Sequence, residues 1–373
     1  MAVSRPLLGV QSPIQCQLCQ QGEKISCKCL ECDLLMCNSC KNNVHSKFKT
    51  EKEHRVIDIK EIGLCDNKGA PASNENKVSA ELYVVGTFQT KIECISHVAV
   101  SLDDSLWIGE GTQKKGITLF SSHTALQKVK IVGKKLQVMS SFNIWAYAIS
   151  MTPNNDLLIV TEGSRLKEIK NQASKITDSA FNFPSGTPMA VYVTRKNKII
   201  VGVCEHSNDT CLVYVMNPEG NQERVYGEDK TKDISFTDIT SITDTSNDNI
   251  FVIDTEDILF YGCIKVLGMN NVINTYSGLS AINTEDNPFT PLDLATTPAD
   301  NVIVADMNNS VLHFLNASGE LITYINTVDK GIEFPKAICL AMAGQFCVLY
   351  IGTSVVPDGR DKGKLYKLSI TGI

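Results

Sequence analysis

From residue 81 to the end of the chain one pattern recurs: an apolar run, a short polar turn and a second apolar run. It occurs six times, as HVAVSLDDSLWIG (97–109), YAISMTPNNDLLIV (147–160), MAVYVTRKNKIIV (189–201), ITSITDTSNDNIFVI (239–253), PLDLATTPADNVIVA (291–305) and PKAICLAMAGQFCVL (335–349). Apolar runs bounded by Asn, Asp, Gly, Pro and Ser predict short strands joined by tight turns. The spacing is 51, 42, 51, 52 and 44 residues when it is measured at the turn residues Asp104, Asn155, Asn197, Asp248, Asp300 and Gly344.

A repeat of this length is typical of a propeller. Each interval has room for two further strands, as in SVLHFLNASGELITYI (310–325), where residues 316–319 suit a hairpin turn. A four-stranded unit cannot bury both of its faces alone, so the units must pack against one another. Six units therefore predict an all-β six-bladed propeller over residues 81–373. A β-sandwich, or two smaller β domains, is the alternative.

The two ends of the repeat region predict how the ring closes. The sixth unit ends in GKLYKLSITGI (363–373), which is long enough for a third strand only. The run ELYVVGTFQT (81–90) stands before the first unit without a partner. We therefore expect the N-terminal strand to be the outer strand of the last blade, antiparallel to residues 363–370.

Cysteines are concentrated in front of the repeats, where eight of the fourteen lie within the first 65 residues. Three C-x2-C pairs are followed by two histidines, which gives eight candidate ligands: Cys16, Cys19, Cys29, Cys32, Cys37, Cys40, His45 and His54. Zinc takes four thiolate or imidazole ligands tetrahedrally, so eight ligands predict two Zn2+ ions. Cys27 does not fit the two-residue spacing and is expected to be a free thiol. A group of buried free thiols is the alternative, but a polar segment this short has few apolar side chains with which to build a core.

With four protein ligands for each ion, no coordination position is left for water or substrate. The zinc is therefore expected to be structural, and the segment to depend on it for folding. Spacing alone allows two ligand pairings: a sequential one, 16/19/29/32 with 37/40/45/54, and an interleaved one.

The order C-x2-C-x9-C-x2-C-x4-C-x2-C-x4-H-x8-H resembles the B-box zinc finger of the tripartite-motif family over residues 14–62. The resemblance implies a cross-brace, with Cys16, Cys19, Cys37 and Cys40 on one ion and Cys29, Cys32, His45 and His54 on the other. The fifth unit, VIVADMNNSVLHFLNASGELI (302–322), resembles the NHL type of propeller repeat, which follows B-boxes in one branch of that family.

Other parts of that family's usual architecture are not seen in this sequence. Residues 1–13 are expected to be a disordered N-terminus, and the few residues before Cys16 cannot form a RING finger. Residues 63–80 are polar, contain glycine and proline, and are expected to be a linker instead of a coiled coil. Ubiquitin ligation would then require a partner, so an accessory or substrate-recognition role in it is one alternative function.

No catalytic constellation or cofactor-binding motif stands out, and we expect the chain not to be an enzyme. Residues 80–373 hold 24 Lys and Arg against 32 Asp and Glu, a net charge of −8, which disfavours RNA binding. Basic clusters do occur at Lys128, Lys130, Lys134 and Lys135 and at Arg195, Lys196 and Lys198. An RNA-binding regulator is therefore the other alternative. The favoured prediction is a protein-interaction adaptor that binds protein partners through its B-box and propeller loops. Without a secretory signal or membrane span, the expected location is the cytoplasm.

Overall fold

The computed structural model describes residues 19, 26–29, 34–43, 56–58, 80–111, 125–171, 173–205, 210–228, 234–256, 261–343, 346–354 and 362–372. The chain separates into two compact units, residues 1–77 and 78–371, and each is described by itself. Within these ranges no helix combines the length and the apolar composition needed to cross a bilayer.

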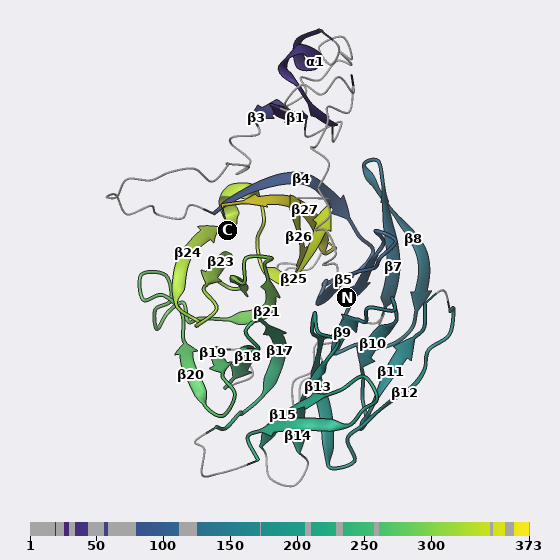
Figure 1. The fold of residues 1–373 in the computed structure, drawn as a ribbon, viewed down its shortest axis with the longest axis vertical. Helices are drawn as coiled ribbons and strands as arrows, with labels where there is room; N and C mark the ends of the chain where they lie inside the picture. The colour runs from purple at the N-terminus through teal and green to yellow at the C-terminus, as the bar shows by residue number, and fades with distance from the viewer. Residues whose placement is uncertain are drawn as a thin grey trace, which may run out of the picture. The chain divides into compact units, whose positions relative to one another are not determined.

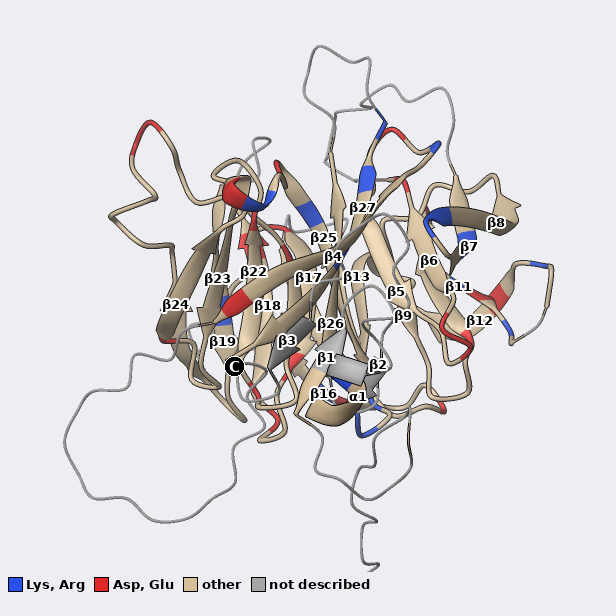
Figure 2. Ribbon diagram, turned by 90° about the horizontal axis from the view of Figure 1, so that it is seen from above, with Lys and Arg blue, Asp and Glu red and all other residues tan. Residues whose placement is uncertain are grey.

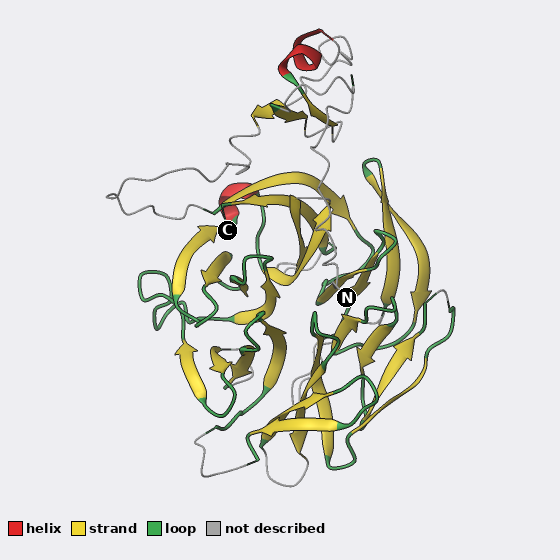
Figure 3. Ribbon diagram, viewed as in Figure 1, coloured by secondary structure: helices red, strands yellow, loops and turns green. Residues whose placement is uncertain are grey.

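The larger unit is built almost entirely from strands and loops and contains six four-stranded antiparallel sheets (Figure 3). The sheets stand as blades around a central axis (Figure 1), which confirms the six-bladed propeller. Because the six sheets form one ring, the β-sandwich alternative is wrong.

Each blade is given from its innermost to its outermost strand. Blade 1 contains β5 (His97–Val100), β6 (Leu106–Gly109), β7 (Leu126–Val132) and β8 (Lys135–Phe142), and blade 2 contains β9 (Ala148–Met151), β10 (Leu157–Val160), β11 (Arg165–Ile169) and β12 (Thr177–Asn182). Blade 3 contains β13 (Gly186–Val193), β14 (Ile199–Glu205), β15 (Cys211–Met216) and β16 (Gln222–Tyr226), and blade 4 contains β17 (Ile239–Asp244), β18 (Ile250–Thr255), β19 (Gly262–Leu267) and β20 (Val272–Tyr276). Blade 5 contains β21 (Pro291–Thr296), β22 (Val302–Asp306), β23 (Val311–Leu315) and β24 (Leu321–Asn326), and blade 6 contains β25 (Pro335–Ala343), β26 (Phe346–Thr353), β27 (Lys364–Thr371) and β4 (Glu81–Gln89).

Blade 6 joins the two ends of the propeller sequence. β4 pairs antiparallel with β27 from Lys364 opposite Gln89 to Thr371 opposite Glu81. The ring is thus closed by hydrogen bonds between strands that lie more than 270 residues apart in sequence.

The turns between the first two strands share one backbone geometry. Five of the turn residues that define the sequence period have a left-handed φ of 59° to 65°: Asp104, Asn155, Asn197, Asp248 and Asp300. Asn and Asp enter this region more readily than other residues with a side chain. In blade 2, for example, the Asn155 N–H donates to the Thr152 carbonyl at 2.9 Å, and the Thr152 N–H donates to the Asp156 carbonyl at 2.8 Å. The sixth turn residue, Gly344, lies outside the described ranges.

The core lies between neighbouring blades. One cluster joins Leu312 and Phe314 of blade 5 to Leu349 and Leu368 of blade 6. All five residues of β22 are buried, as are all five of β23. Eight of these ten residues are apolar, all except Asp306 and His313, because both faces of the strands pack against other blades.

The smaller unit contains a three-stranded antiparallel sheet in the order β2 (Leu34–Met36), β1 (Cys27–Cys29), β3 (Val56–Asp58). A short helix, α1 (Asn38–Asn43), follows β2.

Candidate functional site

The innermost strands of all six blades enclose a cavity of about 340 Å³ on the propeller axis. In blades 3 to 6 the inner strand has a β-bulge near its start, at Met189, Thr240, Leu292 and Lys336. A bulge redirects a side chain out of the regular alternation, and all four of these residues line the cavity. Lys336 is the only cation, and Asp293 the only carboxylate, among the described residues of its wall.

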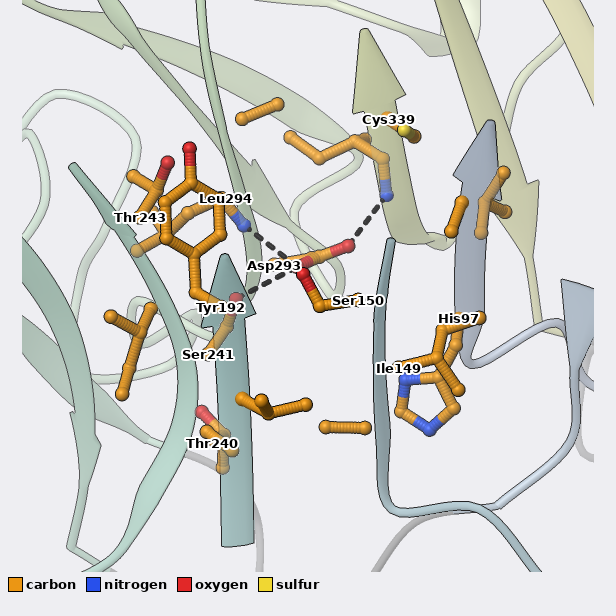
Figure 4. A pocket seen from close by; sticks show the side chains of 18 of the residues that line it. His97, Ile149, Ser150, Tyr192, Thr240, Ser241, Thr243, Asp293, Leu294 and Cys339 are labelled. Atoms are coloured by element: carbon orange, nitrogen blue, oxygen red, sulfur yellow. Dashed lines mark hydrogen bonds between the residues drawn. The ribbon is translucent and has the colours of Figure 1, made fainter. Parts of the chain in front are cut away.

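Asp293 lies on β21 and connects three blades (Figure 4). Its carboxylate accepts hydrogen bonds from the Ser241 hydroxyl at 2.8 Å and from the Ile338 N–H at 2.8 Å. It also accepts a bond from the Leu294 N–H at 2.9 Å. Burial raises the pKa of Asp293 to about 6, although the three donors act to lower it.

His97, at the start of β5, also lines the cavity (Figure 4). Its Nε2 lies 2.9 Å from the Gly111 carbonyl oxygen and 3.0 Å from that of Ala146. Carbonyl oxygens only accept, so Nε2 carries the proton and donates to both. Burial, followed by the charge of Lys336, lowers the pKa of His97 to about 4, which keeps the imidazole neutral at pH 7. His97 is thus a histidine that faces the cavity and has its ring N–H bonded.

The basic cluster of Arg195, Lys196 and Lys198 forms ion pairs with carboxylates of the propeller. Arg195 lies 3.6 Å from Asp300 and donates to the Thr297 carbonyl at 2.8 Å. The other two members lie 2.7 and 2.8 Å from carboxylates, in the pairs Lys196 with Asp248 and Lys198 with Glu223. This cluster therefore leaves little positive charge for phosphate groups.

The second basic cluster lies on the hairpin of β7 and β8 (Figure 2). Lys128 forms an ion pair with Asp103 at 3.0 Å. Lys130, Lys134 and Lys135 are exposed. The uncompensated positive charge of this cluster is thus at the outer edge of blade 1.

Three of the expected zinc ligands lie together in the N-terminal unit, since the sulfurs of Cys19, Cys37 and Cys40 are all within 4.8 Å of one another. The Sγ atoms of Cys19 and Cys37 are 3.9 Å apart, and the Cys40 N–H donates to the Cys37 Sγ at 3.4 Å. Sulfurs held about 2.3 Å from a tetrahedral zinc lie about 3.8 Å apart, so these three thiols fit the ion. In the cross-brace pairing these three thiols belong to one quartet, and in the sequential pairing to two. The fourth member, Cys16, lies outside the described residues, so the pairing stays a prediction.

The other expected ligands are less completely described. Cys29 lies in β1, and Cys16, Cys32, His45 and His54 lie outside the described residues. Cys27, expected to be a non-ligand, is buried with its thiol 3.5 Å from the Met36 carbonyl oxygen.

Two cysteines outside the N-terminal cysteine cluster form a disulfide. Cys204 and Cys211 lie opposite each other on β14 and β15 and are bonded. Their separation of seven residues was the available sequence signal. No comparable signal marked Asp293 or Lys336, because the positions that face the cavity depend on how the blades pack.

The chain matches no family model and no curated protein. It is similar in structure to the PQQ-bound form of an aldose sugar dehydrogenase from Streptomyces coelicolor, with 9% identity, 79% of this chain and 99% of that chain covered, and a TM-score of 0.54. It is also similar to regucalcin, a calcium-binding protein from Agrobacterium tumefaciens (9% identity, 76% and 93% covered, TM-score 0.53). A third similar structure is a putative oxidoreductase (glucose dehydrogenase) from Thermus thermophilus (10% identity, 78% and 100% covered, TM-score 0.51).

At this level of identity the similarity shows the propeller fold alone. The resemblance to the tripartite-motif family is supported by none of these comparisons and stays a prediction. The expectation that the chain is not an enzyme is contradicted, because the similar structures include an aldose sugar dehydrogenase and a putative glucose dehydrogenase. A site on the axis of a ring would draw its residues from separate blades, so no short sequence motif would mark it.

Proposed function

We propose that this protein is a recognition protein that binds a protein partner at the edge of propeller blade 1, with its N-terminal unit held by structural zinc. The observation that carries the proposal is the exposure of apolar side chains on the β7–β8 hairpin. Met139 is 52% exposed, Val138 43% and Val132 54%. None of the eight residues of β8 is buried.

β8 is the outermost strand of its sheet, so one edge of its backbone is free to pair with another chain. Met139 is the extra residue of a β-bulge and lies between Val138, which pairs with Val129 of β7, and Ser140, which pairs with Lys128. Apolar side chains at a free strand edge, next to exposed lysines, favour an extended partner segment that is acidic and carries apolar residues.

The N-terminal unit supports a binding role in a different way. A unit this small, with a three-stranded sheet and one short helix, has little core, and the thiol group of Cys19, Cys37 and Cys40 would supply its folding energy when zinc is bound. Such a closed zinc site presents a rigid surface and leaves no position for chemistry on the metal. The accessory role in ubiquitin ligation would use these same surfaces.

Quantitative pull-downs with the full-length protein test the proposal. We expect Val138→Ser with Met139→Ser to lose a defined set of partner proteins that the wild type retains. The matched control is Met269→Ser, which removes an even more exposed methionine, 68% exposed, from blade 4. The proposal fails if the double variant and the control retain the same partners.

The alternative function, RNA binding, is tested by a separate binding assay. Lys134→Glu with Lys135→Glu would abolish a salt-dependent shift of single-stranded RNA if the hairpin bound phosphates. We expect the wild type to show no such shift, and a shift that this variant abolishes would replace the protein-partner proposal.

A further inference from the structure

Cys94 lies in the loop between β4 and β5 and meets side chains from two other segments of the chain. The Lys336 Nζ donates to its Sγ at 3.1 Å. The Ser354 Oγ lies 3.4 Å from the same sulfur, and the Ser96 Oγ lies 3.7 Å from it. Residues more than 240 positions apart in the sequence thus converge on one thiol.

The charges around this sulfur favour its thiolate form. Burial acts to raise the pKa of Cys94, but the Lys336 ammonium and the hydrogen bonds from Ser354, Lys336 and Ser96 outweigh it, so the pKa is lowered. Of the neighbouring groups that titrate, His97 is neutral at pH 7, and Glu93 is paired with Lys362 at 2.7 Å.

A second thiol nearby has a pKa shifted in the opposite direction. Cys339 lines the axial cavity, and burial together with the charge of Asp293 raises its pKa to about 12. The pKa of the thiol beside Lys336 is thus lowered while that of the thiol in the cavity wall is raised, and such opposed shifts are common where one group has a chemical role.

The pair lies beside the axial cavity, since Lys336 and Ser96 are both part of its wall. Cys94 itself is only partly buried. Thr240, another bulge residue of that wall (Figure 4), has a buried Oγ1 with no hydrogen-bond partner among the residues that the structure describes. A buried hydroxyl needs a partner, and a polar ligand in the cavity would supply one.

We propose that Cys94 and Lys336 form a nucleophilic site at the axial cavity that captures small α,β-unsaturated carbonyl compounds. The sulfur lone pair of the thiolate forms a C–S bond to the β-carbon, and the π-electron pair of the C=C bond moves to the α-carbon. The α-carbon takes a proton from the Lys336 ammonium, which leaves a thioether and a neutral amine that regains its proton from water. This site is separate from the β7–β8 edge, so it does not depend on partner binding there.

The test uses acrylamide, a small conjugated amide, with peptide mapping by mass spectrometry on the intact full-length protein. We expect Cys94 to be alkylated at pH 7 at least about tenfold faster than Cys339, because only the thiolate is nucleophilic. Lowering a thiol's pKa by one unit raises the thiolate fraction up to tenfold but reduces its nucleophilicity about threefold, so Lys336→Met should slow Cys94 about threefold or more. The pH at which alkylation is half-maximal should rise in the same variant.

Two further variants separate this chemistry from a structural role of the lysine. Lys336→Arg keeps the positive charge and should keep the low pH midpoint, whereas Lys198→Met removes a lysine from the β13–β14 turn of blade 3 and should leave Cys94 unchanged. Thermal unfolding shows whether each variant is folded. If Lys336→Met does not fold, the comparison of Lys336→Arg with the wild type serves as the test. The proposal is overturned if Cys94 reacts no faster than Cys339, or if its pH midpoint is that of an ordinary thiol.

Discussion

Asp293 illustrates how a single side chain holds several blades. Its carboxylate accepts bonds from Ser241 of blade 4 and Ile338 of blade 6, while its own strand belongs to blade 5. Burial makes the ionised form of a carboxylate unfavourable when no cation lies beside it. The pKa of Asp293 is raised to about 6 for this reason. Nothing in the local sequence PLDLATT distinguishes this aspartate from one in a turn.

The stability of the propeller should therefore depend on pH through Asp293. A carboxyl whose pKa rises from 3.8 to about 6 on folding stabilises the fold below pH 4 and loses that contribution as pH rises to about 6. We expect the wild type to lose up to about 3 kcal/mol relative to Asp293→Asn across this window. Urea unfolding at several pH values measures the difference in free energy of unfolding between the wild type and Asp293→Asn. Asp244 has a similarly raised pKa but is present in both proteins, so its contribution cancels in this difference. A difference that stays constant with pH would contradict the prediction.

At the scale of elements, the inner hairpins were the most predictable part of the molecule. Their turns need a left-handed residue, and Asp or Asn stands at that position in five blades. The turns also contact one another, since Asn155 of blade 2 accepts from the Leu102 N–H of blade 1 at 2.8 Å. Asp300 of blade 5 similarly accepts from the Ser246 N–H of blade 4 at 3.1 Å. The turn type follows from local residues, whereas these contacts between blades do not.

The closing strand β4 should be essential for the stability of the ring. Phe88 of β4 is 6% exposed and packs in a cluster with Leu365 and Val348 of the same blade. We expect Phe88→Ala to lower the free energy of unfolding by about 3 kcal/mol or more, because it leaves a cavity between blades 6 and 1. Val84→Ala on the same strand is the control, since Val84 is 36% exposed. Equal effects of the two substitutions in chemical denaturation would show that β4 does not hold the ring closed.

At the scale of the whole molecule, the two units are expected to be stabilised by different means. The propeller has apolar clusters between its blades, whereas the N-terminal unit has a group of three thiols beside a small sheet. Hydrophobic burial stabilises the propeller, and we propose that metal ligation stabilises the N-terminal unit.

Metal analysis should return two zinc ions per chain. A strong chelator should remove the unfolding transition of the N-terminal unit and leave that of the propeller in place. Cys19→Ser should reduce the zinc content, while Cys27→Ser should not, because Cys27 lies outside the proposed quartets. A zinc content near one would remove one quartet, and a loss of zinc in Cys27→Ser would reassign the ligands.

The amino-acid sequence was sufficient to predict the six-fold repeat, the inner turns and the pairing of the first strand with the last blade. These features follow from local chemistry: apolar runs form strands, Asn and Asp form the turns, and an unpaired strand must find an edge. The folded structure was needed to show which side chains face the axis, which lysines are paired with carboxylates, and that Cys94 contacts Lys336. Those contacts join residues from different blades, and their distances depend on how the ring closes, which no local pattern in the sequence records.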